Sequence, residues 1–218
     1  MYSYLEEFYS QICHIDVLQF FNNYKNAGKI HKELTESIGC YKAAVDIMSL
    51  NSLEERLVLI IGDGKFARTG SIFSHMSKWT CISIDPEMDI NWFDGYKDYK
   101  ASTGKPIRRL QCIRSTIEDA KIDYAKSVNF EKFILVFPHS HAKIKSSVQK
   151  FASVFGGDTP FDMVNMPCCV EVPSSLRTRK FLRDHNYTSY CDTNVLSPKN
   201  TVHCWKNLTS NILKEKTK

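Results

Sequence analysis

The stretch that decides the fold reads Leu57-Val58-Leu59-Ile60-Ile61-Gly62-Asp63-Gly64. Its apolar residues follow one another without polar alternation, which is typical of a parallel strand covered on both faces. The two glycines let the chain turn sharply after the strand and let the backbone approach a ligand closely. The stretch therefore predicts a buried strand followed by a glycine loop.

Apolar runs and helical patterns alternate along the chain after this loop. Beyond 57–61, the predicted strands are 80–84, 108–113, 132–137, 162–166, 187–191 and 201–205, and the predicted helices are 71–78, 117–128, 141–155 and 174–185. Strands that alternate with helices predict a mostly parallel α/β sheet with helices on both faces. The last two strands have no helix between them and predict an antiparallel C-terminal hairpin. We therefore expect a Rossmann-like sheet of about seven strands.

The two ends of the chain differ from this middle part. Residues 1–50 carry apolar side chains at helical spacing, with a helix expected over about 31–48, and predict an N-terminal helical segment packed on the core. Residues 51–213 predict one Rossmann-like domain, because a chain of 218 residues suits a single well-buried core. Residues 214–218 are charged, lack apolar anchors and predict a disordered basic tail.

The composition narrows the class of protein. No apolar stretch reaches the roughly 18 to 20 residues that a membrane span requires, and the first residues do not have the layout of a signal peptide. The 8 cysteines show no spacing typical of a zinc site, so we expect no metal and a reduced intracellular compartment, cytoplasmic or nuclear. A net charge of +5 is compatible with RNA or another anionic partner, and equally with solvated lysines.

The carboxyl ends of the predicted strands form the candidate site. In an open parallel sheet, ligands bind beyond these ends, where the strand order reverses. Asp85 lies at the end of the second predicted strand, where its carboxylate can accept hydrogen bonds from both ribose hydroxyls of an adenosine. The alternatives are a plain strand-to-helix turn for the glycine loop and a turn-forming role before Pro86 for Asp85. Residues 115–119 could place polar groups near an adenine or form a helix capping box.

This order of features resembles the class I S-adenosylmethionine-dependent methyltransferases. The shared features are the glycine loop, the acidic end of the second strand, the polar end of the third strand and the closing hairpin, over roughly residues 55–206. The resemblance implies methyl transfer with S-adenosylmethionine as cofactor. It implies cofactor contacts from Gly62, Asp63, Gly64, Arg68, Thr69, Asp85, Pro86 and Glu118.

Two other functions stay open at this point. Ile60 stands where the family usually carries an acidic residue, and this favours a catalytically silent, methyltransferase-like binding module. Gly62, Gly64 and Ala67 also fit the Gly-x-Gly-x-x-Ala dinucleotide pattern, so an NAD-dependent oxidoreductase is a further alternative. Such an enzyme needs a hydride-transfer constellation, and we find no convincing one in the sequence.

Two strand ends carry candidate catalytic residues. Methyl transfer requires alignment of the reactants and sometimes a base. His139, after the fourth strand, is a candidate base or acceptor-orienting residue, with a helix cap as the alternative. Cys168, after the fifth strand, is a candidate nucleophile for methylation of a pyrimidine carbon, with a buried structural cysteine as the alternative. Some RNA methyltransferases are similar in carrying a histidine and paired cysteines at these places.

Basic residues are expected around the same edge of the sheet. They are Lys65, Arg68, Arg108, Arg109 and Arg114. Such a group can form an electropositive rim for a phosphate-bearing substrate. The first hypothesis is therefore methyl transfer to RNA or another nucleic acid.

Overall fold

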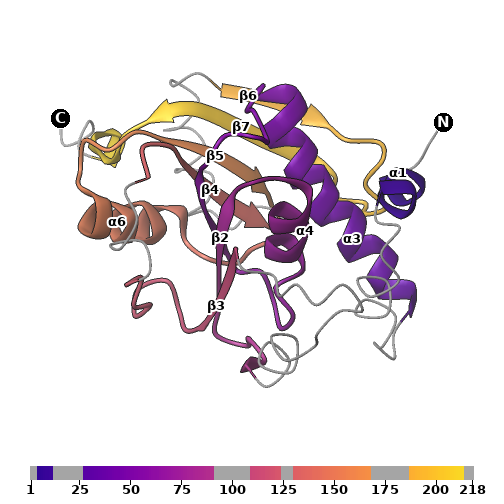
Figure 1. Ribbon diagram of the computed structural model, residues 1–218, viewed down its shortest axis with the longest axis horizontal. Coiled ribbons are helices and arrows are strands. Elements are labelled where there is room, and N and C mark those ends of the chain that lie inside the picture. Colours follow the sequence, from indigo (N-terminus) through magenta and orange to yellow (C-terminus); the bar gives the residue numbers. More distant parts are fainter. Residues whose placement is uncertain (1–3, 12–26, 91–108, 124–129, 168–186, 214–218) are drawn as a thin grey trace.

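A single seven-stranded sheet organises the chain. The structure is a computed structural model that describes residues 4–11, 27–90, 109–123, 130–167 and 187–213. The strand order is β3-β2-β1-β4-β5-β7-β6, and Figure 1 shows the sheet as one continuous twisted layer. The strands are β1 (Leu57–Ile61), β2 (Thr80–Asp85), β3 (Leu110–Arg114), β4 (Phe133–Pro138), β5 (Phe161–Met166), β6 (Tyr187–Cys191) and β7 (Thr201–Leu208).

The pairing of the strands confirms the predicted topology. The first five strands pair in parallel, and β7 runs antiparallel to both β5 and β6. The Rossmann-like α/β sheet and its C-terminal hairpin are therefore as expected. The chain runs outward from β1 to β3 and then returns to β4 on the other side of β1, so the strand order reverses between β1 and β4. A ligand site is expected above this reversal, at the carboxyl ends of the strands.

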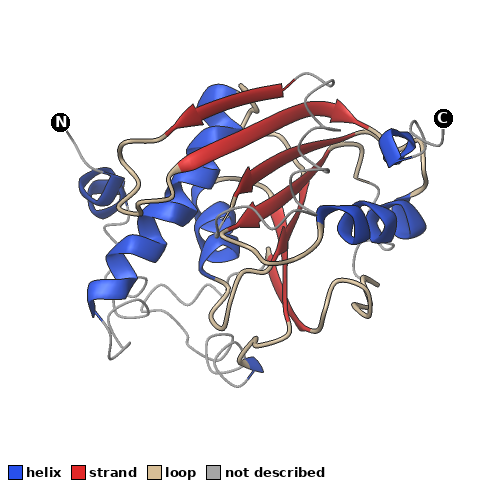
Figure 2. Cartoon of the chain, turned by 180° about the vertical axis from the view of Figure 1, so that it is seen from behind, coloured by secondary structure: helices blue, strands red, loops and turns tan. Residues whose placement is uncertain are grey.

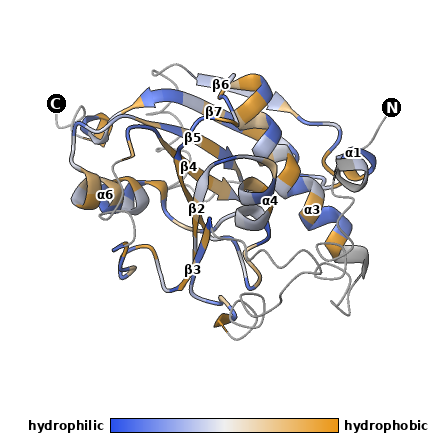
Figure 3. Cartoon of the chain, in the orientation of Figure 1, coloured by the Kyte–Doolittle hydropathy of each residue, from blue (hydrophilic) through white to orange (hydrophobic). Residues whose placement is uncertain are grey.

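Two apolar clusters cover the two faces of the sheet. The described helical elements are α1 (Tyr4–Gln11), α3 (Ala27–Lys42), the π-helical turn η1 (Ala43–Ile47), α4 (Arg68–Met76), α6 (Ile144–Phe155) and the 3₁₀ turn η3 (Ser210–Leu213). Alternate residues of the completely buried β1 point to opposite faces, as in any strand. Val58 and Ile60 join the cluster that includes α3 and α4, while Leu57, Leu59 and Ile61 join the cluster that includes α6. Figure 2 shows the helices around the sheet, and Figure 3 shows the apolar colour of the central strands.

Helix α3 lies close to the sheet and to the β6–β7 connection. Its buried residues, such as Leu34 and Ile38, belong to the same cluster as Val136 of β4 and Met166 of β5. A Cβ at Gly39 would lie 2.7 Å from Val195 Cγ2, so the glycine allows this close approach without ending the helix. Tertiary packing rather than helix propensity decides this position.

One predicted helix is wrong over its described part. The segment 117–123 forms a turn followed by irregular chain instead of the start of a helix over 117–128, whose last residues lie outside the described ones. Ile117, Ala120 and Ile122 are buried against the sheet and belong to the α6-side cluster, so irregular chain covers this part of the face. The predicted helix 174–185 and tail 214–218 also lie outside the described residues. Among the described helices, none is both long and apolar enough to cross a membrane.

Candidate functional site

The β1–α4 loop contains two glycines with left-handed backbone and different surroundings. Gly62 has φ +76° and Gly64 has φ +72°. A Cβ at Gly62 would lie 2.2 Å from Ser140 Oγ, because the segment after β4 packs directly against this residue. A Cβ at Gly64 would meet no heavy atom within 4 Å. Gly62 therefore joins the loops after β1 and β4, whereas Gly64 faces open space.

Asp63 holds the loop against the start of helix α4. Its Oδ1 accepts a hydrogen bond from the backbone N–H of Thr69, and its Oδ2 accepts one from the N–H of Gly70, each at 2.9 Å. Ser83 Oγ donates to Oδ2 at 2.6 Å. These contacts satisfy N–H groups that the first turn of a helix leaves unpaired. Burial raises the pKa of Asp63 to about 6, outweighing the opposing effect of these hydrogen bonds. The described chain itself thus engages both carboxylate oxygens.

Asp85 lies at the tip of β2, beside the open side of the loop. Its Oδ2 accepts a hydrogen bond from Gly64 N at 2.9 Å, and its Oδ1 accepts one from Glu87 N at 2.8 Å. The second contact is the turn-forming role that the sequence left open. A carboxylate offers about four lone-pair positions, so one bond per oxygen leaves acceptor capacity on both. The neighbouring Pro86 is exposed. Asp85 can therefore hold its own loops and still accept hydrogen bonds from a ligand.

Helix α3 adds polar side chains to the same region. Glu33 forms an ion pair with Arg68, whose guanidinium carbon lies 5.3 Å from the centre of the Phe66 ring. Ser37 Oγ lies 2.9 Å from Thr69 Oγ1 in a buried hydrogen bond. The N-terminal helical segment thus contacts the first turn of α4 directly. Two of the residues that the resemblance assigned to the cofactor, Arg68 and Thr69, bond here to the chain itself.

His139 follows the last residue of β4 and has an unusual backbone. Its φ is 50°, a left-handed conformation that residues other than glycine rarely adopt, and its N–H donates to Met166 O at 2.8 Å. Its Nε2 lies 3.1 Å from Lys199 O and 3.4 Å from Glu36 Oε1. Burial lowers the pKa of His139, against the opposing effects of Glu36 and of the Lys199 carbonyl. His139 is thus held by contacts from three separate parts of the chain.

The remaining candidates lie farther from this corner or outside the described residues. Glu118 is exposed in the turn after β3, and its backbone carbonyl accepts a hydrogen bond from Lys150 Nζ at 3.1 Å. Cys168 lies outside the described residues. Among the basic residues, Arg114 pairs in register with Asp85 and is exposed.

The expectation that Arg109 lies at the same edge is wrong. Arg109 precedes β3, and β3 runs parallel to β2, so this residue lies at the amino end of the sheet. Its Nη2 donates to Ser74 O at 2.9 Å, at the end of α4. The expectation failed because it grouped Arg109, at the start of the predicted strand 108–113, with Arg114, which follows the end of that strand. The two ends of one strand lie at opposite edges of the sheet. Arg108 lies outside the described residues.

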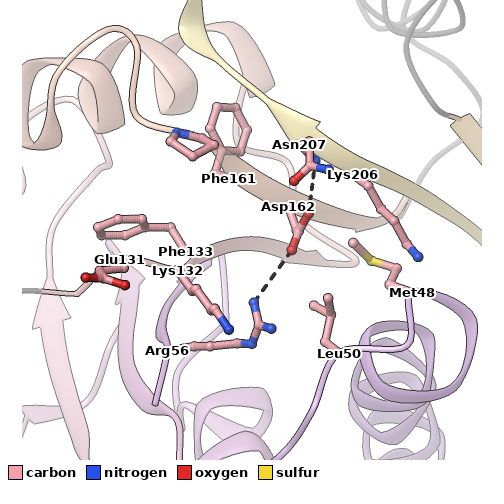
Figure 4. A pocket seen from close by; sticks show the side chains of 11 residues that line it. Met48, Leu50, Arg56, Glu131, Lys132, Phe133, Phe161, Asp162, Lys206 and Asn207 are labelled. Carbon is pink, nitrogen blue, oxygen red and sulfur yellow. Dashed lines mark hydrogen bonds and ion pairs between the residues drawn. The ribbon is translucent and has the colours of Figure 1, made fainter. Parts of the chain in front are cut away.

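A cavity of about 290 Å³ opens at the amino end of the sheet (Figure 4). Residues before or at the start of β1, β4 and β5 line much of it, together with part of β7. Arg56 Nη1 lies 3.8 Å from Asp162 Oδ2, and Arg56 Nη2 lies 3.0 Å from Glu54 Oε2. The lining residues are Met48, Leu50, Arg56, Glu131, Lys132, Phe133, Pro160, Phe161, Asp162, Lys206 and Asn207. None of them is a candidate site residue, so this cavity is separate from the corner at the carboxyl ends.

The sequence interpretation missed the contribution of α3. Glu33, Glu36 and Ser37 recur at three- and four-residue spacing, which places them on one side of a helix. Glu36 and Ser37 are buried, between the apolar Leu34 and Ile38. Acidic and hydroxyl side chains within an apolar stripe were the available signal, but their partners could not be identified from the sequence.

Comparison with solved structures places this fold among known ones. MtNAS in complex with MTA and tNA has a TM-score of 0.50 and is 12% identical, with 93% of this chain and 74% of that chain covered. A mutant of MtNAS in complex with S-adenosylmethionine has a TM-score of 0.49 and 12% identity, covering 93% and 76%. An rRNA methylase from Streptococcus thermophilus has a TM-score of 0.45 and 12% identity, covering 76% and 95%. No protein-family model and no curated protein matches the chain.

Topology and comparison together define the class of fold. The seven-stranded order, the reversal between β1 and β4 and the antiparallel β7 agree with the likeness to MtNAS in complex with MTA and tNA, which has a TM-score of 0.50. The chain has the Rossmann-like fold of the class I S-adenosylmethionine-dependent methyltransferases. At this level of identity, the likeness concerns the fold.

Proposed function

We propose that the chain is an S-adenosylmethionine-dependent methyltransferase. The observation that carries the proposal is the corner formed by Gly64 and Asp85. The backbone of Gly64 faces open space, and the Asp85 carboxylate beside it lies 9% exposed with acceptor capacity left. Both features suit an adenosine. Its ribose offers two hydroxyl donors to a carboxylate, and the nucleoside can lie close to the backbone where no side chain stands between them. The residues present therefore fit an adenosyl cofactor.

The surrounding residues support the same placement. Asp63, through Thr69 and Gly70, fixes the loop at the first turn of α4, so Gly64 is presented on a rigid support. Gly62 connects the loop to Ser140 and hence to the segment that carries His139. When bound, S-adenosylmethionine supplies an electrophilic methyl group on a sulfonium. In our proposal Asp85 holds the ribose, while Gly64 leaves room for the cofactor.

His139 is the residue that we propose as the base. It follows β4, next to the point where the strand order reverses, and its burial keeps the pKa of the imidazole low. A neutral imidazole can take a proton from an N–H or O–H acceptor during methyl transfer. Alignment of the acceptor with the methyl group then accounts for most of the remaining rate enhancement. Cys168 is kept as a second candidate for acceptors that need a nucleophile.

Nucleic acid is the substrate class that we favour. The chain carries a net charge of +5, and the exposed Lys65 and Arg114 lie near the cofactor corner. Exposed basic side chains beside a reaction site suit a phosphate-bearing acceptor. A small-molecule or protein acceptor requires no such charge. The rRNA methylase likeness, with a TM-score of 0.45, carries no weight in this choice.

The experiment is a set of calorimetric titrations followed by product analysis. S-adenosylmethionine and S-adenosylhomocysteine should bind, and NAD⁺ and NADH should not. The cofactor product is then identified by chromatography after incubation with total RNA, because each carbon on the sulfonium leaves a different product. S-adenosylhomocysteine as product supports methyl transfer, and methylthioadenosine means that another carbon is transferred. Binding without turnover supports a silent module, while binding of the dinucleotides alone supports an oxidoreductase.

A further inference from the structure

We propose that Glu36 is a positioning residue that compensates the positive charge of protonated His139 and, together with the Lys199 carbonyl, keeps a proton on Nε2. This inference rests on the proposed role of His139 as the base. Glu36 comes from α3, outside the part of the chain that the methyltransferase resemblance covers. Its Oε1 nevertheless lies 3.4 Å from His139 Nε2, and the two residues belong to distant parts of the chain. A carboxylate that faces a histidine base can orient the ring and compensate the charge that it gains.

The position of Glu36 is costly without such a role. The residue is 6% exposed, and its Oε1 accepts no hydrogen bond within the described part of the chain. Among the described residues, the groups near Glu36 that can carry a positive charge are Lys32 Nζ, at 3.5 Å from Oε1, and the imidazole of His139. The Lys32 side chain is 45% exposed, so water weakens its attraction. A desolvated carboxylate in this place gains most when the neighbouring imidazole is protonated.

The hydrogen bond of His139 fixes which ring nitrogen carries the proton. Lys199 contributes a backbone carbonyl oxygen, which can only accept, at 3.1 Å from Nε2. The Nε2 atom of the neutral ring must therefore donate, and the carboxylate of Glu36 favours a proton on the same side. In this tautomer the lone pair lies on Nδ1. Nδ1 is thus the nitrogen that can take a proton from an acceptor.

The charged groups around His139 divide into two kinds. Lys32 of α3 and Lys199 of the β6–β7 connection disfavour the imidazolium, as does burial, while Glu36 favours it. Before the reaction, burial and the two lysines keep the imidazole ring neutral, so that it can act as a base. During the reaction, the proton of the acceptor moves to Nδ1 of His139, and the lone pair of the acceptor atom forms the bond to the methyl carbon. The electrons of the broken carbon–sulfur bond stay on sulfur. Glu36 then faces a cation instead of a neutral ring.

The test is a pH titration of the histidine signals by NMR in the full-length protein without cofactor. A spectrum of the His139→Gln variant assigns the resonances. In the unsubstituted protein, the imidazole ¹⁵N shifts should show a proton on Nε2. Glu36→Gln should lower the pKa of His139 by about one unit, because an opposite charge is removed at close range. Glu33→Gln, one turn earlier on α3 and paired with Arg68, should leave the His139 pKa unchanged.

Activity measurements separate this inference from the proposed function. Glu36→Gln should reduce kcat about tenfold at neutral pH and shift the acidic limb of the pH profile to lower pH, with cofactor affinity within about twofold. A proton on Nδ1, or an unchanged His139 pKa in Glu36→Gln, overturns the role of Glu36. If Glu36→Gln does not fold, Glu36→Asp, whose shorter side chain moves the carboxylate away from the ring, takes its place: it should also lower the His139 pKa, and an unchanged pKa in this variant overturns the role of Glu36. Failure of cofactor binding in calorimetry overturns the proposed function and leaves the NMR result standing.

Discussion

The two edges of the sheet contain charged side chains in different arrangements. At the amino edge, Arg56 lies between Glu54 and Asp162, and Lys132 Nζ lies 2.5 Å from Glu54 Oε2. At the carboxyl edge, Asp85 bonds to loop N–H groups, and Glu36 faces a histidine whose pKa is lowered. The amino edge contains the cavity of about 290 Å³, yet its charges largely compensate one another. The comparison teaches that the cavity coincides with charges that compensate one another, whereas the carboxyl edge, where we propose the site, keeps unused hydrogen-bonding capacity on Asp85.

The largest expected effect is a loss of turnover when His139, at the carboxyl edge, is substituted. His139→Ala should lower turnover by about 100-fold or more, because a general base contributes roughly 10²- to 10⁴-fold. Cofactor affinity should change by no more than about twofold, since the ring contacts Lys199 O and Glu36 rather than the Gly64–Asp85 corner. Steady-state kinetics and calorimetry on the same preparation measure both. Equal losses in both would assign His139 to the scaffold.

A matched pair of glycine substitutions tests the difference between the two loop positions. Gly62→Ala should destabilise the fold by about 2 to 4 kcal/mol, because left-handed strain adds to the clash with Ser140. Gly64→Ala adds strain alone, so it should cost about 1 to 2 kcal/mol. Its methyl group enters the space proposed for the cofactor and should weaken binding. Urea denaturation and calorimetry check the two predictions, which fail if the variants show the same pattern.

Asp85 and Arg56 provide a comparison across the two edges. Asp85→Ala should weaken S-adenosylmethionine binding by about 1 to 3 kcal/mol, the cost of losing a buried hydrogen-bond acceptor. Arg56→Met removes a buried charge at the amino edge and should alter stability without changing cofactor affinity. Calorimetric titration of both variants measures the difference. Unchanged affinity in Asp85→Ala would reject the placement of the ribose.

Asp63 gives the smallest effect, and it depends on pH. Its folded-state pKa, raised to about 6, exceeds the roughly 3.9 of an unfolded aspartate. The folded state therefore binds the proton more tightly, so the stability from this group is complete below about pH 4 and is lost as pH rises through 6. The stability difference between the unsubstituted protein and Asp63→Asn should be larger at about pH 5 than at about pH 7.5, by on the order of 1 kcal/mol. A pH-independent difference in urea denaturation would contradict this prediction.

Much of the fold follows from local sequence patterns. The run before Gly62 predicts a central strand because five apolar side chains need cover on both faces, and the structure buries all five. The helix predicted over 117–128 fails in its described part, because Ile117, Ala120 and Ile122 cover the sheet as irregular chain. Apolar spacing over so short a segment does not distinguish a helix from such a covering segment.

The positions of the candidate residues at the strand ends were predictable, but their contacts were not. The strand-end rule locates Gly64, Asp85 and His139 at one edge, because the carboxyl ends of parallel strands lie together. The contacts of Asp63 with Thr69 and Gly70 depend on the left-handed backbone of the loop, which the sequence does not give. Glu36 was missed because its partner, His139, is distant in the chain and depends on how α3 packs on the sheet.

A crystal structure of the full chain with S-adenosylhomocysteine is the most direct measurement. We predict the ribose hydroxyls within hydrogen-bonding distance of the Asp85 carboxylate and the nucleoside against the backbone of Gly64. A nucleoside bound elsewhere, for example in the cavity beside Arg56, would contradict the central claim. A structure with no nucleoside at the Gly64–Asp85 corner at saturating ligand would contradict it as well.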